Sequence, residues 1–86
     1  MKDQLVGKNV LIRTVTHYHL GKVEAIEDGF VRLSSASWVA DTGRFGQALA
    51  IGTLSEVEPF VDDVFVSLGA IVDVTTWNHP LPTEAK

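Results

Sequence analysis

The sequence predicts a mostly β protein, a small five-stranded open barrel with a short N-terminal helical turn and a short helical insert before the last two strands. Segments rich in β-branched residues alternate with turns that contain Gly, which is typical of short antiparallel strands. One segment, at about residues 43–52, has the apolar spacing of a helix instead. The 86 residues suffice for one domain, which we expect over residues 1–78, followed by a loose tail over 79–86.

The first half of the chain is predicted to supply three consecutive strands. One helical turn is expected over residues 3–7. A first strand is expected over residues 9–19, because this segment is rich in Val, Ile and Thr. Residues 22–25 and 30–34 alternate polar and apolar side chains around the Glu-Asp-Gly turn at 27–29, which predicts a hairpin.

The helical insert is predicted from apolar residues at i, i+3 and i+4, counted from Phe45. Asp41 or Thr42 can cap the N-terminus of this helix, because a side-chain oxygen can accept a hydrogen bond from a free backbone N–H group. Gly52 suits the left-handed position that ends many helices. We therefore expect a short helix that ends at Gly52.

Two closing strands are predicted over residues 64–68 and 71–77, with a turn between them. The preceding segment, 53–62, is acidic and contains Pro59, so we interpret it as a solvated connection with room for a brief extended piece. An open barrel keeps two exposed strand edges, and such edges invite pairing with another chain. If every copy pairs head to tail with the next, a closed ring follows.

Composition favours a self-associating protein. A chain this short buries only about 60–65% of its unfolded surface, so it needs additional stabilisation. Its lack of Cys excludes disulfides and thiolate metal sites, and its hydrophobic fraction of 45% suggests apolar surface for neighbouring copies. The net charge of −4 disfavours non-specific binding to nucleic acid. We see neither a membrane span nor a signal-peptide core, so we expect a cytoplasmic protein without membrane contact.

Three short segments resemble the Sm/LSm/Hfq family. Residues 5–10 (LVGKNV) are similar to its helix-to-strand junction, residues 21–27 (GKVEAIE) to the start of its first motif, and residues 66–71 (VSLGAI) stand where its second motif lies. The resemblance covers about residues 3–35 and 62–77. It implies an Sm-like, SH3-type barrel that forms a homo-oligomeric ring, in a divergent member of bacterial or phage type.

The RNA-binding residues of that family do not match. Sm rings hold uridine with an Asn and an Arg-Gly pair, and these positions fall on Val31, Ser67 and Leu68. The Lys-His pair of Hfq would fall on Leu68 and Gly69. Val31 cannot hydrogen-bond a base edge, and Leu68 cannot stack as a guanidinium does. The usual uridine pocket is therefore not expected, and the insert is foreign to the simplest family members.

Four residues are candidates for ligand contact. His17 and His19 would share one face of a strand, where they could bind an anion or a metal, but no third ligand is nearby and we predict no metal. Trp38 could stack on a flat ligand, or pack against the helical insert or a neighbouring copy. Arg44, at the expected helix start, could hold an anion, or form a salt bridge with Asp41.

The sequence thus predicts a non-enzymatic ring that acts as a scaffold or adaptor, or as a small-ligand-binding module. No Cys nucleophile, no Gly-x-Ser-x-Gly motif and no Gly-rich phosphate loop is present, and we expect no cofactor. The alternative is RNA or single-stranded DNA binding through a face other than the usual uridine pocket. The family resemblance supports this alternative, whereas the charge and the missing pocket residues oppose it.

Overall fold

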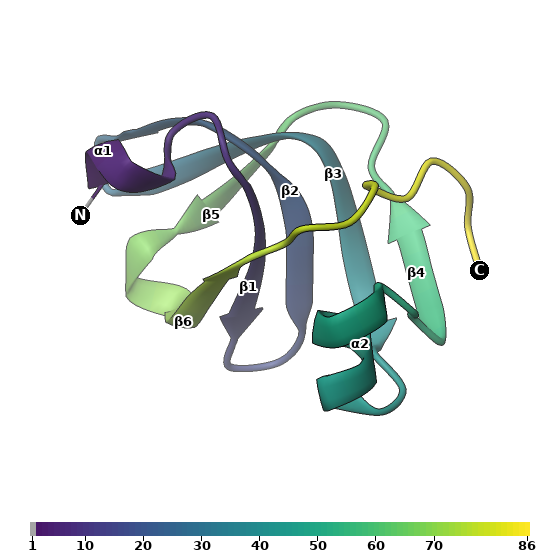
Figure 1. Ribbon diagram of the computed structural model, residues 1–86. Helices are drawn as coiled ribbons and strands as arrows, with labels where there is room; N and C mark the ends of the chain where they lie inside the picture. The colour runs from purple at the N-terminus through teal and green to yellow at the C-terminus, as the bar shows by residue number, and fades with distance from the viewer. Residues whose placement is uncertain (1) are drawn as a thin grey trace.

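Three antiparallel strands, joined in chain order, form the centre of the fold. The computed structural model describes residues 2–86, and Figure 1 shows its elements. A helical turn, α1 (Lys2–Leu5), precedes β1 (Asn9–Thr14), β2 (Tyr18–Glu27) and β3 (Phe30–Asp41). Each strand pairs with the next, and the pairing of β2 with β3 around Gly29 confirms the predicted hairpin.

The prediction of one continuous strand over residues 9–19 was wrong. A tight turn separates β1 from β2, and both the backbone N–H and the hydroxyl of Thr14 donate hydrogen bonds to the carbonyl oxygen of His17, each at 2.8 Å. β-Branched residues favour extended backbone, but they do not distinguish one long strand from two strands around a turn. Here the Thr14 hydroxyl forms a hydrogen bond with a backbone carbonyl group of the turn and so stabilises it.

The long strand β3 bends and pairs with two strands along one edge. Its first half pairs with β5 (Val64–Ser67), and its second half pairs with β4 (Glu56–Pro59). At the bend, Ser35 has a φ of 47°. A side chain on Gly21 would lie 2.9 Å from the Cβ atom of Leu33, so only Gly allows β2 to approach β3 this closely.

The sheet has six strands, where five were expected. Its order is β4-β3-β2-β1-β6, with β5 beside β3, and it does not close. A 3-10 turn, Leu68–Ala70, joins β5 to β6 (Ile71–Thr76), which pairs with β1. The additional strand, β4, lies in the segment predicted as a connection. Acidic residues and a terminal Pro59 are not typical of a strand. Pairing with β3 nevertheless gives the backbone N–H and C=O groups of β4 hydrogen-bond partners.

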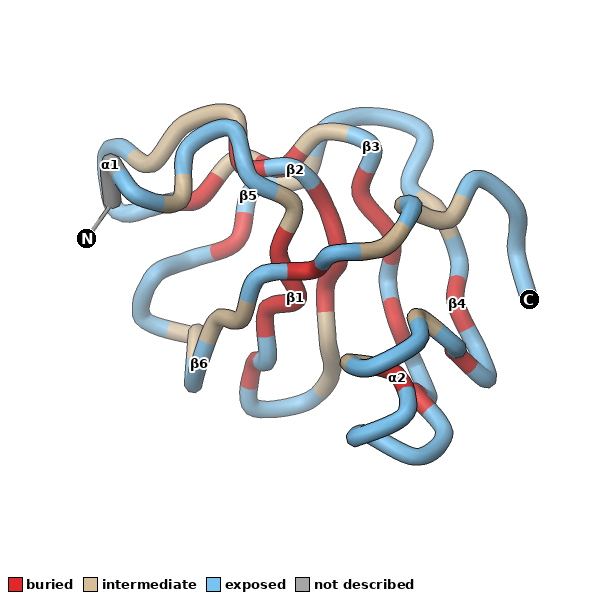
Figure 2. Tube along the Cα trace, in the orientation of Figure 1, coloured by how far each residue is buried: buried red, intermediate tan, exposed pale blue. Residues whose placement is uncertain are grey.

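Both faces of the sheet bury apolar side chains. Figure 2 shows that buried positions recur along the central strands. The concave cluster is formed by Val10, Ile12, Val23, Val31, Leu33, Ala36 and Val66. On the opposite face, α2 (Phe45–Ile51) and the C-terminal segment cover the sheet, as Figure 1 shows. This second cluster contains Leu11, Leu20, Val39, Ala48, Leu54, Val57 and Trp77. The helical insert therefore covers a sheet face that would otherwise expose apolar side chains to water.

Helix α2 forms as predicted, but its expected cap does not. Gly52 ends the helix in the left-handed conformation, with a φ of 78°. The N-cap position is Arg44, which makes no side-chain capping bond. Asp41, at the end of β3, instead accepts a hydrogen bond from the Gly43 N–H at 2.8 Å. The carboxylate therefore stabilises the turn before the helix and not the helix itself.

The segment expected to be a loose tail is docked against the body of the chain. The backbone of Lys86 exchanges two hydrogen bonds with that of Val57, at 2.8 and 3.1 Å. Leu81 packs against the second apolar cluster. The segment contains two prolines and cannot extend a central strand, but it can lie across the sheet. Among the described residues, no helix is long and apolar enough to cross a membrane.

Candidate functional site

Four rings gather on the exposed face of β2, β3 and β4. His17 lies between His19 and Trp38, with ring centroids 4.7 Å and 5.5 Å away, and His19 stacks on Phe60 at 6.0 Å. We call His17, His19, Trp38 and Phe60 the ring cluster. Trp38 and Phe60 remain 37% and 40% exposed, so the cluster is open to a partner.

Strand register explains why these residues meet. His19 lies directly opposite Trp38 in the β2–β3 pair, and residues opposite each other project from the same face. His17 lies in the turn just before β2, and its ring is 4.7 Å from that of His19, so it lies beside the same face. Phe60 follows β4, and its backbone N–H donates to the carbonyl of Ala36 at 2.8 Å, which holds it beside β3.

The ring cluster lies on the face opposite α2. Val39, the neighbour of Trp38 in β3, belongs to the apolar cluster that contains Ala48 of α2. Successive side chains of a strand point to opposite faces, so Trp38 points away from the helix. The sequence alternative in which Trp38 packs against the helical insert is therefore wrong.

His19 is the most buried member of the ring cluster, at 8% exposed. Its Nδ1 atom is buried and has no hydrogen-bond partner in the part of the chain that the structure describes. Burial lowers the pKa of His19 from its ordinary value, and the charge of His17 lowers it further. His19 therefore favours the neutral imidazole, which is compatible with stacking between rings.

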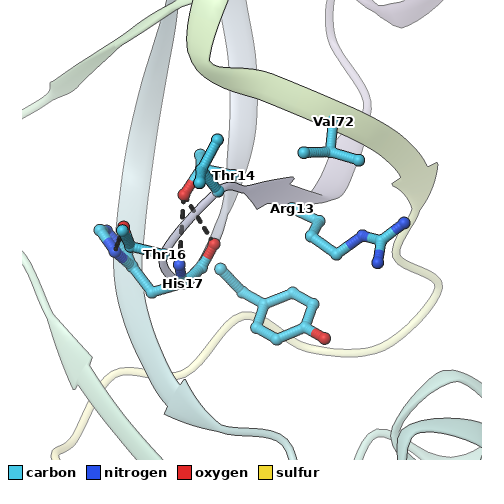
Figure 3. Close-up of a pocket in the computed structure, with 7 residues that line it drawn as sticks. Arg13, Thr14, Thr16, His17 and Val72 are labelled. Carbon is cyan, nitrogen blue, oxygen red and sulfur yellow. Dashed lines mark hydrogen bonds between the residues drawn. The ribbon is translucent and has the colours of Figure 1, made fainter.

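His17 joins the ring cluster to an open pocket at the β1–β2 turn (Figure 3). The pocket has a volume of about 370 Å³ and is lined by Arg13, Thr14, Val15, Thr16, His17, Tyr18 and Val72. Within it, the Thr16 hydroxyl lies 2.7 Å from Nδ1 of His17. This contact orients the imidazole, while the turn hydrogen bonds hold its backbone, so His17 is a positioned group on the rim of the cluster.

Arg44 does not belong to the ring cluster. It precedes α2, on the covered face, and neither of the two ion pairs among the described residues involves it. The pairing expected with Asp41 is therefore not formed, since the Asp41 carboxylate binds the Gly43 N–H instead. Of the four residues predicted from sequence, three converge and one lies apart.

Phe60 was not identified from the sequence as part of this face, and Glu58 was interpreted only as part of a solvated acidic connection. Phe60 lies in the segment interpreted as a connection, and Glu58 lies directly opposite Trp38 in the β3–β4 pair. The alternation Glu56-Val57-Glu58 could have signalled a strand with acids on one face and Val57 on the other. The presence of Pro59 favoured the interpretation of this segment as a connection instead.

The arrangement offers an aromatic surface. Over the described residues, no three His, Asp or Glu side chains gather closely enough to hold a metal ion. The ring cluster can stack on a planar or cationic group, and its imidazoles can exchange hydrogen bonds. Val31 is buried in the concave cluster.

Comparisons with known proteins leave the chain without an assigned family. No protein-family model matches it, and a search of curated proteins finds no similar sequence.

Proposed function

We propose that this chain is a divergent Sm-like subunit that assembles with copies of itself into a closed ring. In this proposal the ring acts as a non-enzymatic scaffold or adaptor, or as a module that binds a small ligand. The observation that carries the proposal is that β5 and β6 each have a backbone edge without a partner strand. Among the described strands, β5 pairs only with β3 and β6 pairs only with β1, so each keeps one unpaired edge.

The strand order supports an Sm-like barrel. If β4, which follows the helical insert, is set aside, the remaining order is β5-β3-β2-β1-β6. An N-terminal helical turn precedes these five strands, and the 3-10 turn connects the last two. This arrangement agrees with the small barrel that the sequence resemblance implies.

Apolar surface beside the two free edges supports their pairing between copies. Phe65 in β5 is 61% exposed, and Leu68 and Val72 are also exposed. An apolar groove of about 620 Å³ lies at this end of the sheet and is lined by Leu5, Ile26, Val31, Leu68, Ile71, Val72, Asp73 and Val74. Burial of such surface stabilises association by about 25 cal/mol per Å² before the costs of binding.

The two edges belong to different strands, which favours a ring. A contact between β5 of one copy and β6 of the next is head to tail, because the two surfaces are not the same patch. An open chain of copies still has one free β5 edge at one end and one free β6 edge at the other. Copies therefore continue to add until the rotation between neighbours brings the two ends together. A closed ring satisfies the free edges of β5 and β6 in every copy.

Native mass spectrometry tests this proposal. We expect an assembly whose mass is a multiple of 9.4 kDa. Phe65→Lys should reduce this assembly to a monomer, because it places a charge in the apolar contact. Ile51→Lys is the matched control, since Ile51 is 65% exposed but lies on α2, away from both edges. A monomeric wild-type protein, or equal disruption by both variants, would contradict the proposal.

Binding of RNA or single-stranded DNA is the alternative function. The exposed rings of Trp38 and Phe60 favour it, since bases stack on aromatic side chains. The net charge of −4 opposes it. Oligonucleotide binding that weakens steeply as salt increases would support this alternative, and no binding at low salt would exclude it.

A further inference from the structure

The ring cluster is bordered by carboxylates. Glu58 lies directly opposite Trp38, so its side chain projects from the same face at a Cβ distance of about 5 Å. Glu56, two positions earlier in β4, shares this face by the alternation of the strand. Both acids are exposed, and neither forms an ion pair with any residue of the described chain. The result is an aromatic surface with unneutralised negative charge at its border.

Such a surface is suited to a cationic group. The face of an indole ring attracts a cation, and Trp is the strongest of the aromatic side chains in this respect. A carboxylate beside the ring adds Coulomb attraction and can accept two parallel hydrogen bonds from a guanidinium. Among the natural cationic side chains, Arg is planar, so it can stack on Trp38 while its N–H groups reach Glu58.

The same charges disfavour a nucleic acid on this face. A phosphate that followed a base stacked on Trp38 would approach Glu58 and Glu56, which repel it. The arginines of β1 and β3 are already paired with other acids, Arg13 with Asp73 and Arg32 with Asp63. Charge complementarity therefore selects a basic partner.

We propose that Trp38, Phe60 and Glu58 form a docking surface for an arginine side chain presented by a basic segment of a partner protein. The guanidinium lies over the indole of Trp38 and pairs with the Glu58 carboxylate, and the aliphatic part of the arginine contacts Phe60. This inference is independent of the proposed ring-shaped assembly, because the docking surface lies on β2, β3 and β4 and not on the free edges of β5 and β6.

Tryptophan fluorescence tests the proposal with a defined probe, a blocked peptide of alternating Gly and Arg. Trp38 is exposed whereas Trp77 is 3% exposed, so a ligand at this surface changes mainly the Trp38 emission. We expect a saturable change with the Arg peptide at low ionic strength. The same peptide with citrulline in place of Arg, which keeps the shape and lacks the charge, should have no effect.

Two variants that remove the same charge make the test specific. Glu58→Gln should weaken peptide binding about threefold or more, because it removes the adjacent carboxylate. Glu27→Gln is the control, since Glu27 ends β2 at the hairpin opposite Phe30. The length of β3 from Phe30 to Trp38 is about 26 Å measured along the strand, compared with a screening length of about 10 Å at 0.1 M salt. We expect this control to bind as the wild type does.

Several results would overturn the proposal. They are equal binding of the citrulline peptide, equal weakening by both variants, or no saturable change in emission. A change caused by oligothymidylate and not by the Arg peptide would assign the surface to nucleic acid. If Trp38→Ala lowers the assembly mass, the surface contacts another copy instead. Because Glu58 is exposed, its substitution leaves the core intact, and circular dichroism checks this.

Discussion

His79 donates a hydrogen bond from Nε2 to the carbonyl oxygen of Leu49 in α2, at 2.8 Å. Its ring also meets Trp77 edge-on at 5.0 Å. Because Gly52 has no side chain, His79 can pack against its backbone. A Cβ atom on residue 52 would lie only 2.8 Å from the Cβ atom of His79. This one imidazole therefore attaches the C-terminal segment to the helical insert and covers an edge of the second apolar cluster.

His79→Ala should lower the free energy of unfolding by about 1–2 kcal/mol, because it removes a hydrogen bond and a ring contact. Urea unfolding measures this loss, and a red shift of the Trp77 emission would show that water reaches the ring. Asn78→Ala is the neighbouring control, since Asn78 is exposed and its side chain forms no hydrogen bond within the described chain. Equal losses in both variants would mean that His79 does not hold the segment.

Gly21→Ala should destabilise the fold by about 1–3 kcal/mol, because the new Cβ meets the backbone and Cβ of β3 at 2.9–3.3 Å. Gly46→Ala, in α2, should stabilise by up to about 1 kcal/mol, because nothing lies within 4 Å of its added Cβ and Ala favours helix. Thermal unfolding of the two variants should therefore give shifts of opposite sign. Shifts of the same sign would contradict the close approach of β2 to β3.

Acidification should destabilise the protein through His19. Its pKa in the folded chain is below the ordinary 6.5, so the unfolded chain takes up a proton that the folded chain resists. This contribution to stability is complete above pH 6.5 and is lost as the pH falls through 6.5 toward the lowered pKa. The pKa of Glu24 is lowered by its hydrogen bond from Ser34, and its effect begins only below 4.5.

We therefore expect wild type to lose more stability than His19→Phe between about pH 7.5 and 5.5, because Phe keeps the ring and cannot titrate. Denaturant unfolding at the two pH values provides the comparison. An equal loss in both proteins would assign the pH dependence to other groups.

Asp73→Asn should change stability by less than about 1 kcal/mol, because its partner Arg13 is exposed and solvent screens the pair. The small difference should vanish when the unfolding curves are repeated at about 1 M salt. A large loss that persists at high salt would mean that this pair, which connects β1 to β6, stabilises the fold in another way.

Much of the local structure could be predicted from local pattern. The hairpin around Gly29, the helix that ends at Gly52 and the two strands after residue 63 all depend on residues close in sequence. The first strand was predicted too long, because a turn satisfied by the Thr14 side chain has the same β-branched composition as a strand. β4 is the brief extended piece allowed for in residues 53–62, but its pairing with β3 was not predicted, because that pairing is a contact between distant segments.

The candidate site was predictable only where it depends on residues close in sequence. The period of a strand places His17 and His19 on one face, and the sequence alone shows this. It does not show that Trp38 lies opposite His19, because that depends on the length and register of β3. Phe60 and Glu58 join them only through the β3–β4 pairing. Arg44 was predicted from its place beside a helix, but that helix covers the other face.

The sequence by itself determined the mostly β class, the absence of Cys chemistry, the acidic charge and the position of the helical insert. These properties follow from composition and from periods of two and 3.6 residues. Only the tertiary structure decided which strands are neighbours, where β3 bends, how the segment from His79 to Lys86 docks, and that four rings meet beside Glu58. Each of these depends on contacts between distant residues, and local periodicity carries no information about such contacts.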